Sequence, residues 1–419
     1  MAVSLAELIL LGLLVDWLFR KLHIPGLVGM LFVGVVLGPY VLGNINPALL
    51  AISADLRKIA LIVILLRAGF ELSSRTLARI GTMAALLSCV PVILEAAAIT
   101  LLGHRFLGLT YMESAILGCI LAAVSPAVVV PMMINFIKRR MGAKKGIPTL
   151  VLAASSVNDV FVIVIYSGLV GIYLGQKVSI ASKLIAIPVS IVLGITVGLC
   201  LGWILYLIFK RFNPRSTKRV LTILAISVLL IRVEHGLENI IPFAALLAVM
   251  SVGFIILEKN EHYAHEISAK LGKIWVFAEI ILFTMVGTQV NIPVAFKAGF
   301  AGAALIGIAL IARSIGTYLC LLGSNLTTKE RLFVVISYSP KGTVQAAIGA
   351  APLAAMKLAG LNTGPGEVIL AVAVLSIILT APLGAWAISI TGNRILQVAP
   401  PEFKDSYQAA SESEAKNGN

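Results

Sequence analysis

Apolar residues along this chain gather into long runs, and polar residues separate one run from the next. About thirteen runs reach the length of a membrane-spanning helix, which is about 20 residues with a lower limit near 17. Their approximate ranges are 3–20, 25–43, 57–73, 82–103, 112–136, 148–174, 180–209, 219–233, 241–257, 270–289, 297–321, 331–352 and 366–391. The pattern predicts an all-α, multi-pass integral membrane protein that forms a single unit over residues 1–400.

Composition supports a membrane protein and changes how the net charge is interpreted. Only 12% of the 419 residues are charged and the mean hydropathy is +1.02, whereas soluble domains are about 25% charged. The formal net charge of +14 would suggest a nucleic-acid partner for a soluble protein. In a membrane protein, Lys and Arg instead concentrate in cytoplasmic loops, so we expect no nucleic-acid partner.

The distribution of Lys and Arg between loops predicts the orientation. With the N-terminus outside, 22 of the 33 Lys and Arg fall on the cytoplasmic side, eight outside and three within the apolar runs. Thirteen spans then place the C-terminus in the cytoplasm. We expect a bacterial inner or plasma membrane, with lipid around the spans and a disordered cytoplasmic tail over 401–419.

Two of the apolar runs contain residues that interrupt a helix. The fifth run contains Ser125-Pro126 and Pro131, and the twelfth contains Ser339-Pro340-Lys341-Gly342. Proline within a span frees backbone groups, which lipid tolerates only where the gap is buried or lines a cavity. Paired interruptions in the two halves of a transporter indicate inverted repeats with a binding site near the midplane.

The most informative charge is Asp159, the only charged residue between 151 and 171. A carboxylate at the bilayer centre costs about 2.5–3.5 kcal/mol on insertion scales, so it requires a partner, a cavity or an ion. Ser155 lies one helical turn earlier on the same face, and Ser125 supplies another oxygen beside the first break. A lone carboxylate can hold either a proton or a monovalent cation, which is the minimal chemistry of a cation/proton exchanger.

Other charges lie within the apolar runs. Glu95 and Arg313 have opposite signs on separate spans and could neutralise each other, either as a structural brace or as part of transport. Lys341 stands at the second break, where it could offset the charges of half-helix ends. For Arg67 and Glu279 we favour structural roles.

Several motifs together resemble one family. The chain is similar to the cation/proton antiporter superfamily over about residues 5–395, and most closely to its NHA group of sodium/proton antiporters. The motifs are Leu66-Arg67-Ala68-Gly69, Ala123-Val124-Ser125-Pro126-Ala127-Val128-Val129-Val130-Pro131, Gly146-Ile147-Pro148-Thr149, Asn158-Asp159, Arg313, and the run from Ser339-Pro340-Lys341-Gly342 to Gly349.

The resemblance implies an NhaA-like fold, in which a core with two crossed discontinuous helices moves against a dimerisation domain. On this chain, the core would include about 57–174 and 270–391, and the dimerisation helices about 1–43 and 180–257. Asp159 would be the cation- and proton-binding carboxylate, and Ser125 and Ser155 would help to ligate sodium. Arg313 would be the family's basic residue before the second broken helix. No cofactor is implied, because Na⁺ or Li⁺ and H⁺ are the transported ions.

Asn158 departs from the nearest relatives, which usually have two adjacent aspartates at this position. In the superfamily, the Asn-Asp version accompanies electroneutral one-for-one exchange, so we expect a 1:1 sodium (or lithium)/proton antiporter that forms a homodimer. Alternatives are a potassium/proton antiporter and a symporter for sodium and an organic anion on a similar fold. An intramembrane enzyme is disfavoured, because all five histidines fall near span ends or in loops.

Overall fold

Helices make up nearly all of the structure. The computed structural model describes residues 1–22, 26–70, 72, 74–175, 180–237, 243–290 and 292–399. Within these ranges the only β pairing is an isolated antiparallel bridge between Met141 and Val398. The helices are α1 Ala2–Lys21, α2 Gly26–Leu37, α3 Pro47–Ala51, α4 Ser53–Gly69, α5 Ser74–Leu107, α6 Tyr111–Ala122, α7 Pro126–Lys138, the 3₁₀ helix η1 Ala143–Lys145, α8 Ile147–Tyr173, α9 Ile180–Phe212, α10 Ser216–Leu237, α11 Ala245–Lys259, α12 Glu261–Gly287, α13 Ile292–Cys320, α14 Thr328–Ser337, α15 Thr343–Ile348, α16 Ala351–Leu358 and α17 Gly364–Ile395.

The helical segments identify an integral, multi-pass membrane protein. In the described part of the chain, seven helices are long and apolar enough to cross a membrane, with α6 and α7 counted as one span. A helix, or a pair of helices, occupies every one of the thirteen apolar runs. The number of thirteen crossings stays a prediction, and the expected tail over 401–419 lies outside the described residues.

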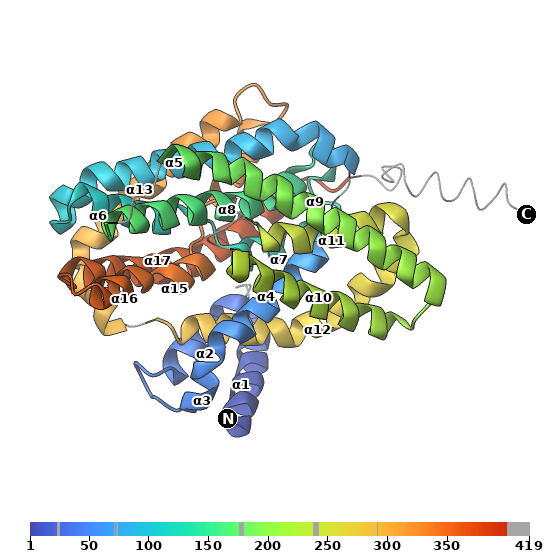
Figure 1. Ribbon diagram of the computed structural model, residues 1–419, viewed down its shortest axis with the longest axis horizontal. Helices are drawn as coiled ribbons and strands as arrows, with labels where there is room; N and C mark the ends of the chain where they lie inside the picture. The colour runs from blue at the N-terminus through green and yellow to red at the C-terminus, as the bar shows by residue number, and fades with distance from the viewer. Residues whose placement is uncertain are drawn as a thin grey trace, which may run out of the picture.

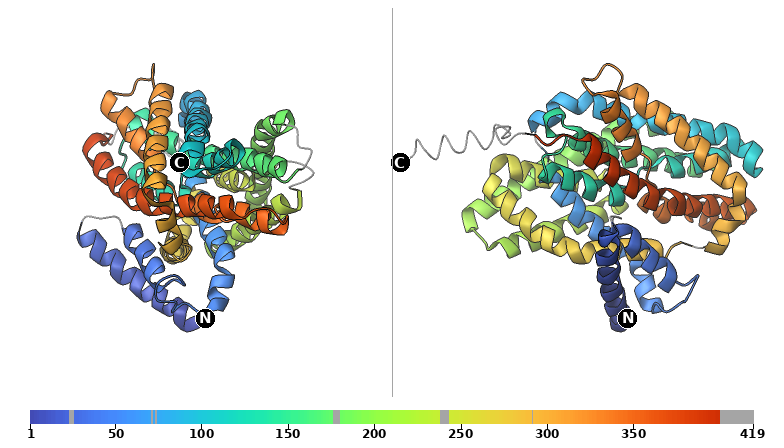
Figure 2. Two further views of the ribbon diagram at one scale, coloured as in Figure 1. Left: turned by 90° about the vertical axis from the view of Figure 1, so that its left-hand side faces the viewer. Right: turned by 180° about the vertical axis from the view of Figure 1, so that it is seen from behind.

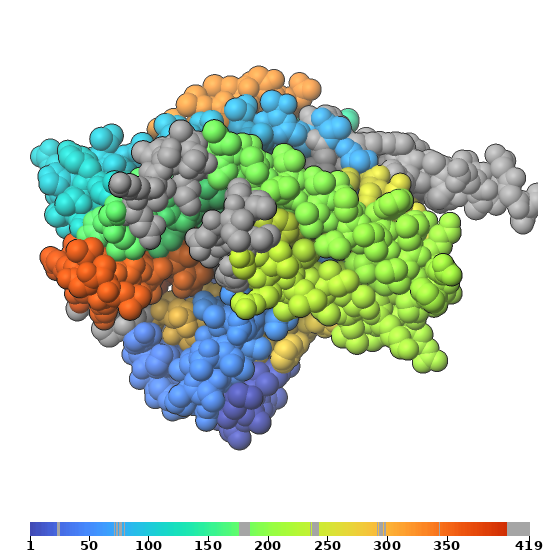
Figure 3. Space-filling view, in the orientation of Figure 1, coloured from blue at the N-terminus to red at the C-terminus, as the bar shows by residue number. Residues whose placement is uncertain are grey.

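The helices form two groups by their contacts within one continuous bundle, which Figures 1 and 2 show from three sides. In one group, α5 packs against α6, α8 and α13, and α13 packs against α17. In the other, α12 packs against α1, α2 and α4, while α11 packs against α4 and α9. In Figure 3, α9 and α10 occupy much of the visible face of this second group. The groups meet where α8 contacts α9 and where α7 contacts α4.

The expected division into core and dimerisation helices stays a prediction. The sequence analysis assigned about 57–73 and 270–289 to the core. In the structure, α4 and α12 pack against each other and against α2 and α11. Small residues let α12 approach its neighbours in the second group closely. A Cβ atom on Gly287 would lie 2.2 Å from the Leu31 carbonyl oxygen of α2.

Two predicted spans are interrupted. In each span, the helix before the break begins with the same capping motif. Thr110 and Thr327 are the N-caps of α6 and α14, and each forms a capping box with the glutamate three residues later, Glu113 or Glu330. The helix ends at Ala122 in one span and at Ser337 in the other. Because the residue before a proline avoids the helical region, Ser125 is extended, with φ −85° and ψ 105°.

Candidate functional site

Asp159 lies near the middle of α8 and is only 5% exposed. Its Oδ1 atom is buried and has no hydrogen-bond partner within the described residues. Ser155, one turn earlier, is fully buried and donates its hydroxyl hydrogen to the Leu152 carbonyl at 3.0 Å. A serine oxygen that donates its hydrogen still carries lone pairs, so Ser155 remains able to ligate a cation.

Asn158 joins α8 to the first break. Its Oδ1 atom accepts a hydrogen bond from the Val124 backbone N–H at 3.0 Å. Val124 lies between α6 and α7, where no helical partner serves that amide. The asparagine therefore caps the interruption, while the Oδ1 atom of the neighbouring aspartate has no hydrogen-bond partner among the described residues.

The two breaks contact each other directly. The Ser125 backbone N–H donates to the Pro340 carbonyl at 2.9 Å. At Gly342, an added Cβ atom would lie 2.5 Å from the Ser125 Oγ atom, so the approach of the second break to Ser125 requires glycine. The Lys341 backbone N–H donates to Thr380 Oγ1 of α17 at 2.8 Å, which fixes the second break to the helix behind it.

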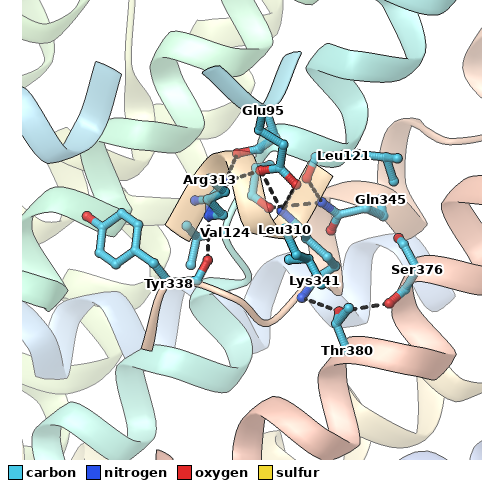
Figure 4. A network of polar contacts seen from close by, with 12 residues as sticks. Glu95, Leu121, Val124, Leu310, Arg313, Tyr338, Lys341, Gln345, Ser376 and Thr380 are labelled. Atoms are coloured by element: carbon cyan, nitrogen blue, oxygen red, sulfur yellow. Dashed lines mark hydrogen bonds and ion pairs between the residues drawn. The ribbon is translucent and has the colours of Figure 1, made fainter. Parts of the chain in front are cut away.

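Glu95 is at the centre of a buried charge network (Figure 4). Its carboxylate forms ion pairs with Arg313 and with Lys341, whose Nζ atom lies 2.7 and 2.9 Å from the two carboxylate oxygens. All three side chains are 1% exposed. Glu95 and Arg313 are thus paired. The Lys341 ammonium group contacts the Glu95 carboxylate, whereas the sequence analysis assigned it to the half-helix ends.

The carbonyl end of α6 is largely occupied by side chains from the second half of the chain. Arg313 donates to the Ala122 carbonyl at 2.7 Å and also to the Tyr338 carbonyl. Gln345 Nε2 donates to the carbonyls of Ile120 at 2.9 Å and Ala123 at 3.0 Å. Side chains from α13 and α15 therefore hold carbonyls that a bare helix break would leave open to an ion.

Arg67 and Glu279 occupy another part of the molecule. Arg67 is buried in α4, and its guanidinium lies 4.0 Å from the position of a Cβ atom added to Gly272 of α12. Glu279 is half-buried in α12. The hydrogen bonds that join Glu95, Arg313 and Lys341 do not involve Arg67.

Gln345 is the main residue of the site that the sequence analysis did not identify. It is 2% exposed, and its Oε1 atom accepts a hydrogen bond from Gly342 N–H at 2.7 Å. Its signal in the sequence was the spacing Gly342-x-x-Gln345 directly after a break, which is the spacing of a capping box. Thr380 has no comparable signal, because its contact with Lys341 depends on how α17 packs.

A buried carboxylate beside two touching helix breaks is typical of secondary transporters, which carry ions through the membrane. A family model described as "Sodium/hydrogen exchanger, transmembrane" matches residues 8–392. The chain belongs to this family, whose members are transporters and whose ions are substrates rather than cofactors.

Relatives and solved structures agree with this family. The chain is 33% identical over 392 residues to sodium/hydrogen exchanger 9B2 of Homo sapiens, covering 91% of this chain and 72% of that protein. It is 28% identical to human sodium/hydrogen exchanger 9B1, covering 89% and 73%. The fold is similar to that of the sodium proton antiporter MjNhaP1 from Methanocaldococcus jannaschii at pH 8, with a TM-score of 0.72 and 24% identity over 93% of this chain and 98% of that chain.

Proposed function

We propose that this protein exchanges Na⁺ or Li⁺ for H⁺ across a membrane by alternating access, and that both ions compete for Asp159. The observation that carries the proposal is the contrast between Asp159 and two other buried acids of the same group of helices, Glu95 and Glu113. Glu95 is paired with two cations, and Glu113 accepts hydrogen bonds from Tyr173 and Thr110. Asp159 alone among these three has an oxygen without a partner.

Oxygen atoms around Asp159 suit a small monovalent cation. Ser155 stands on the same face of α8, and Ser125 lies at the contact between the two breaks. A carboxylate and two hydroxyls are hard oxygen ligands, which alkali cations prefer to nitrogen or sulfur. The proposed sodium site therefore consists of Asp159, Ser155 and Ser125, with Asn158 fixing the first break beside it.

The charges at the site favour electroneutral exchange. Arg313 and Lys341 contribute two positive charges, and Glu95 and an ionised Asp159 contribute two negative charges. Occupation of Asp159 by either one Na⁺ or one H⁺ adds the same single charge. The empty site is then neutral and the two loaded states carry equal charge, as a one-for-one exchange requires.

Transport also needs a structural division that exposes the site to each side in turn. We place α5–α8 and α13–α17 in the moving core, with the two interrupted helices as crossed parts of inverted repeats. The group formed by α1–α4 and α9–α12 would be the stationary part and would carry the homodimer contact. The charge bias of the loops supports an N-terminus outside and a cytoplasmic C-terminus in an inner or plasma membrane.

The proposal is tested by exchange in proteoliposomes with a pH indicator inside. A Na⁺ or Li⁺ gradient should drive proton movement in the parent protein, and Asp159→Asn should abolish it. Asp55→Asn, which changes an exposed aspartate of α4, is the matched control and should exchange at the parental rate. Exchange by Asp159→Asn at the parental rate would contradict the assignment, and exchange driven by K⁺ alone would favour a potassium/proton antiporter.

A further inference from the structure

Three consecutive residues ahead of α7 are held by three different elements. Gln345 of α15 binds the Ala123 carbonyl, Asn158 of α8 binds the Val124 N–H, and the second break binds the Ser125 N–H through Pro340. The backbone that carries the Ser125 hydroxyl is therefore fixed from three directions. Two of these contacts come from side chains, and of those two side chains only Gln345 lies outside the proposed sodium site and its neighbour Asn158.

The Gln345 amide connects the two breaks with both of its ends. Its Oε1 atom accepts from Gly342 N–H at 2.7 Å, which caps the start of α15. Its Nε2 atom donates to the carbonyls of Ile120 and Ala123, which lie at the end of α6. Gly342 is also the residue whose backbone lies against the Ser125 hydroxyl. Gln345 therefore holds both the residues that precede Ser125 and the segment that packs against its hydroxyl.

The chemistry of this position requires a neutral amide. The end of α6 carries the partial negative charge of its carbonyls, and the start of α15 carries the partial positive charge of its N–H groups. An amide offers a donor to the first and an acceptor to the second. A carboxylate of the same shape offers only acceptors, so it would repel the α6 carbonyls.

We propose that Gln345 is a positioning residue that joins the two breaks and thereby sets the place of the Ser125 oxygen in the cation site. This inference rests on the proposed function, because it assigns Ser125 to the bound cation. Loss of the Gln345 contacts should weaken cation binding through Ser125, while the exchange chemistry at Asp159 is retained. The expected signature is a higher KM for the cation with little change in the maximal rate.

The test uses two substitutions of similar size. Gln345→Met removes all of the hydrogen bonds, whereas Gln345→Glu keeps the acceptor for Gly342 N–H and loses the donor to α6. Each variant should raise the KM for Na⁺ and for Li⁺ about tenfold, as expected when buried hydrogen bonds are left unmade, with a maximal rate within about twofold of the parent. Gln289→Met, at a partly buried glutamine whose amide donates to Thr288 Oγ1, should leave KM unchanged.

A second measurement does not depend on transport. Hydrogen exchange of peptides that cover 121–126 and 339–345 should be faster in both Gln345 variants, and exchange in α9 should match the parent. Parental KM in the two folded variants, or unchanged exchange in both peptides, overturns the inference. If the parent exchanges no Na⁺ or Li⁺, the proposed function fails, whereas parental KM in the variants of an active parent refutes only the role of Gln345.

Discussion

Two carboxylates buried in neighbouring helices of this protein have opposite surroundings. Glu95 of α5 is 1% exposed and is in contact with the guanidinium of Arg313 and the ammonium of Lys341. Asp159 of α8 is 5% exposed, and its Oδ1 atom has no partner among the described residues. The helices α5 and α8 pack against each other, so the two acids belong to one body of the molecule.

The difference supports a structural role for Glu95 and the proposed exchange role for Asp159. Glu95 is compensated by two cations, which in turn hold the carbonyls of Ala122 and Tyr338 through Arg313. Removing one member of such a network leaves the others buried and uncompensated. The Asp159 Oδ1 atom holds no other described residue in place, which is why we propose this carboxyl group, rather than Glu95, as the one that exchanges a proton for a cation.

The largest expected effect is on stability, and it compares two matched substitutions of a carboxyl by an amide. Glu95→Gln should destabilise the protein by about 3–5 kcal/mol, because Arg313 and Lys341 would lose their counter-charge. Asp159→Asn should leave stability unchanged or raise it slightly, since it removes a buried charge whose Oδ1 atom has no hydrogen-bond partner among the described residues. Thermal unfolding in detergent measures both, and an equal loss in the two variants would contradict the comparison.

The next effect concerns the number of charges moved in each cycle. Asn158→Asp adds a second carboxyl group beside Asp159 and keeps an oxygen that can accept from Val124 N–H. The variant should then respond to an imposed potential, which supplies about 2.3 kcal/mol per elementary charge at 100 mV. Exchange by the parent should not respond. A parent whose exchange is driven by the potential would exclude the electroneutral assignment.

A smaller effect is expected from the hydroxyls on α8. Ser155 and Ser156 both donate to the Leu152 carbonyl at 3.0 Å, but Ser156 also contacts the sulfur of Met250 of α11. Ser155→Ala should raise the KM for Na⁺ by about threefold to tenfold through the loss of one ligand. Ser156→Ala, the matched control, should keep the parental KM. Equal effects in the two variants would remove Ser155 from the site.

The smallest effect is expected at an ion pair that is only partly buried. Glu330, at the start of α14, forms an ion pair with Lys145 at 2.6 Å, and the Lys145 side chain is 32% exposed. Because water screens such a pair, Lys145→Met should cost less than about 1 kcal/mol of stability. Lys144→Met is the control, and both changes are measured by thermal unfolding. A loss of stability as large as that of Glu95→Gln would show that burial does not determine how much stability is lost when an ion pair is broken.

Much of the fold was readable from the sequence, because lipid imposes strong rules on composition. Apolar runs located the helices, and the Ser-Pro pairs at Ser125 and Ser339 located the two breaks. Asp159 was conspicuous because no other charge lies near it in the sequence. These signals are local in the sequence, so they can be recognised without knowing how the helices pack.

The partners in the charge network were not readable in the same way. The sequence analysis paired Glu95 with Arg313 and assigned Lys341 to the half-helix ends. Glu95 and Lys341 lie 246 residues apart, and their contact depends on how α5 meets the second break. Gln345 carries no charge, and its signal was only its spacing from Gly342, while Thr380 gave no signal. The grouping of α4 and α12 depends on close contacts between helices, which an apolar pattern does not specify.

The central claim is that one cation and one proton compete for Asp159, and proton release on cation binding tests it most directly. Purified protein in weakly buffered detergent is titrated with NaCl, with choline chloride as the control, and the protons released are measured. The account predicts saturable release of one proton for each Na⁺ bound by the parent, and none from Asp159→Asn. Release from Asp159→Asn equal to that of the parent would contradict it.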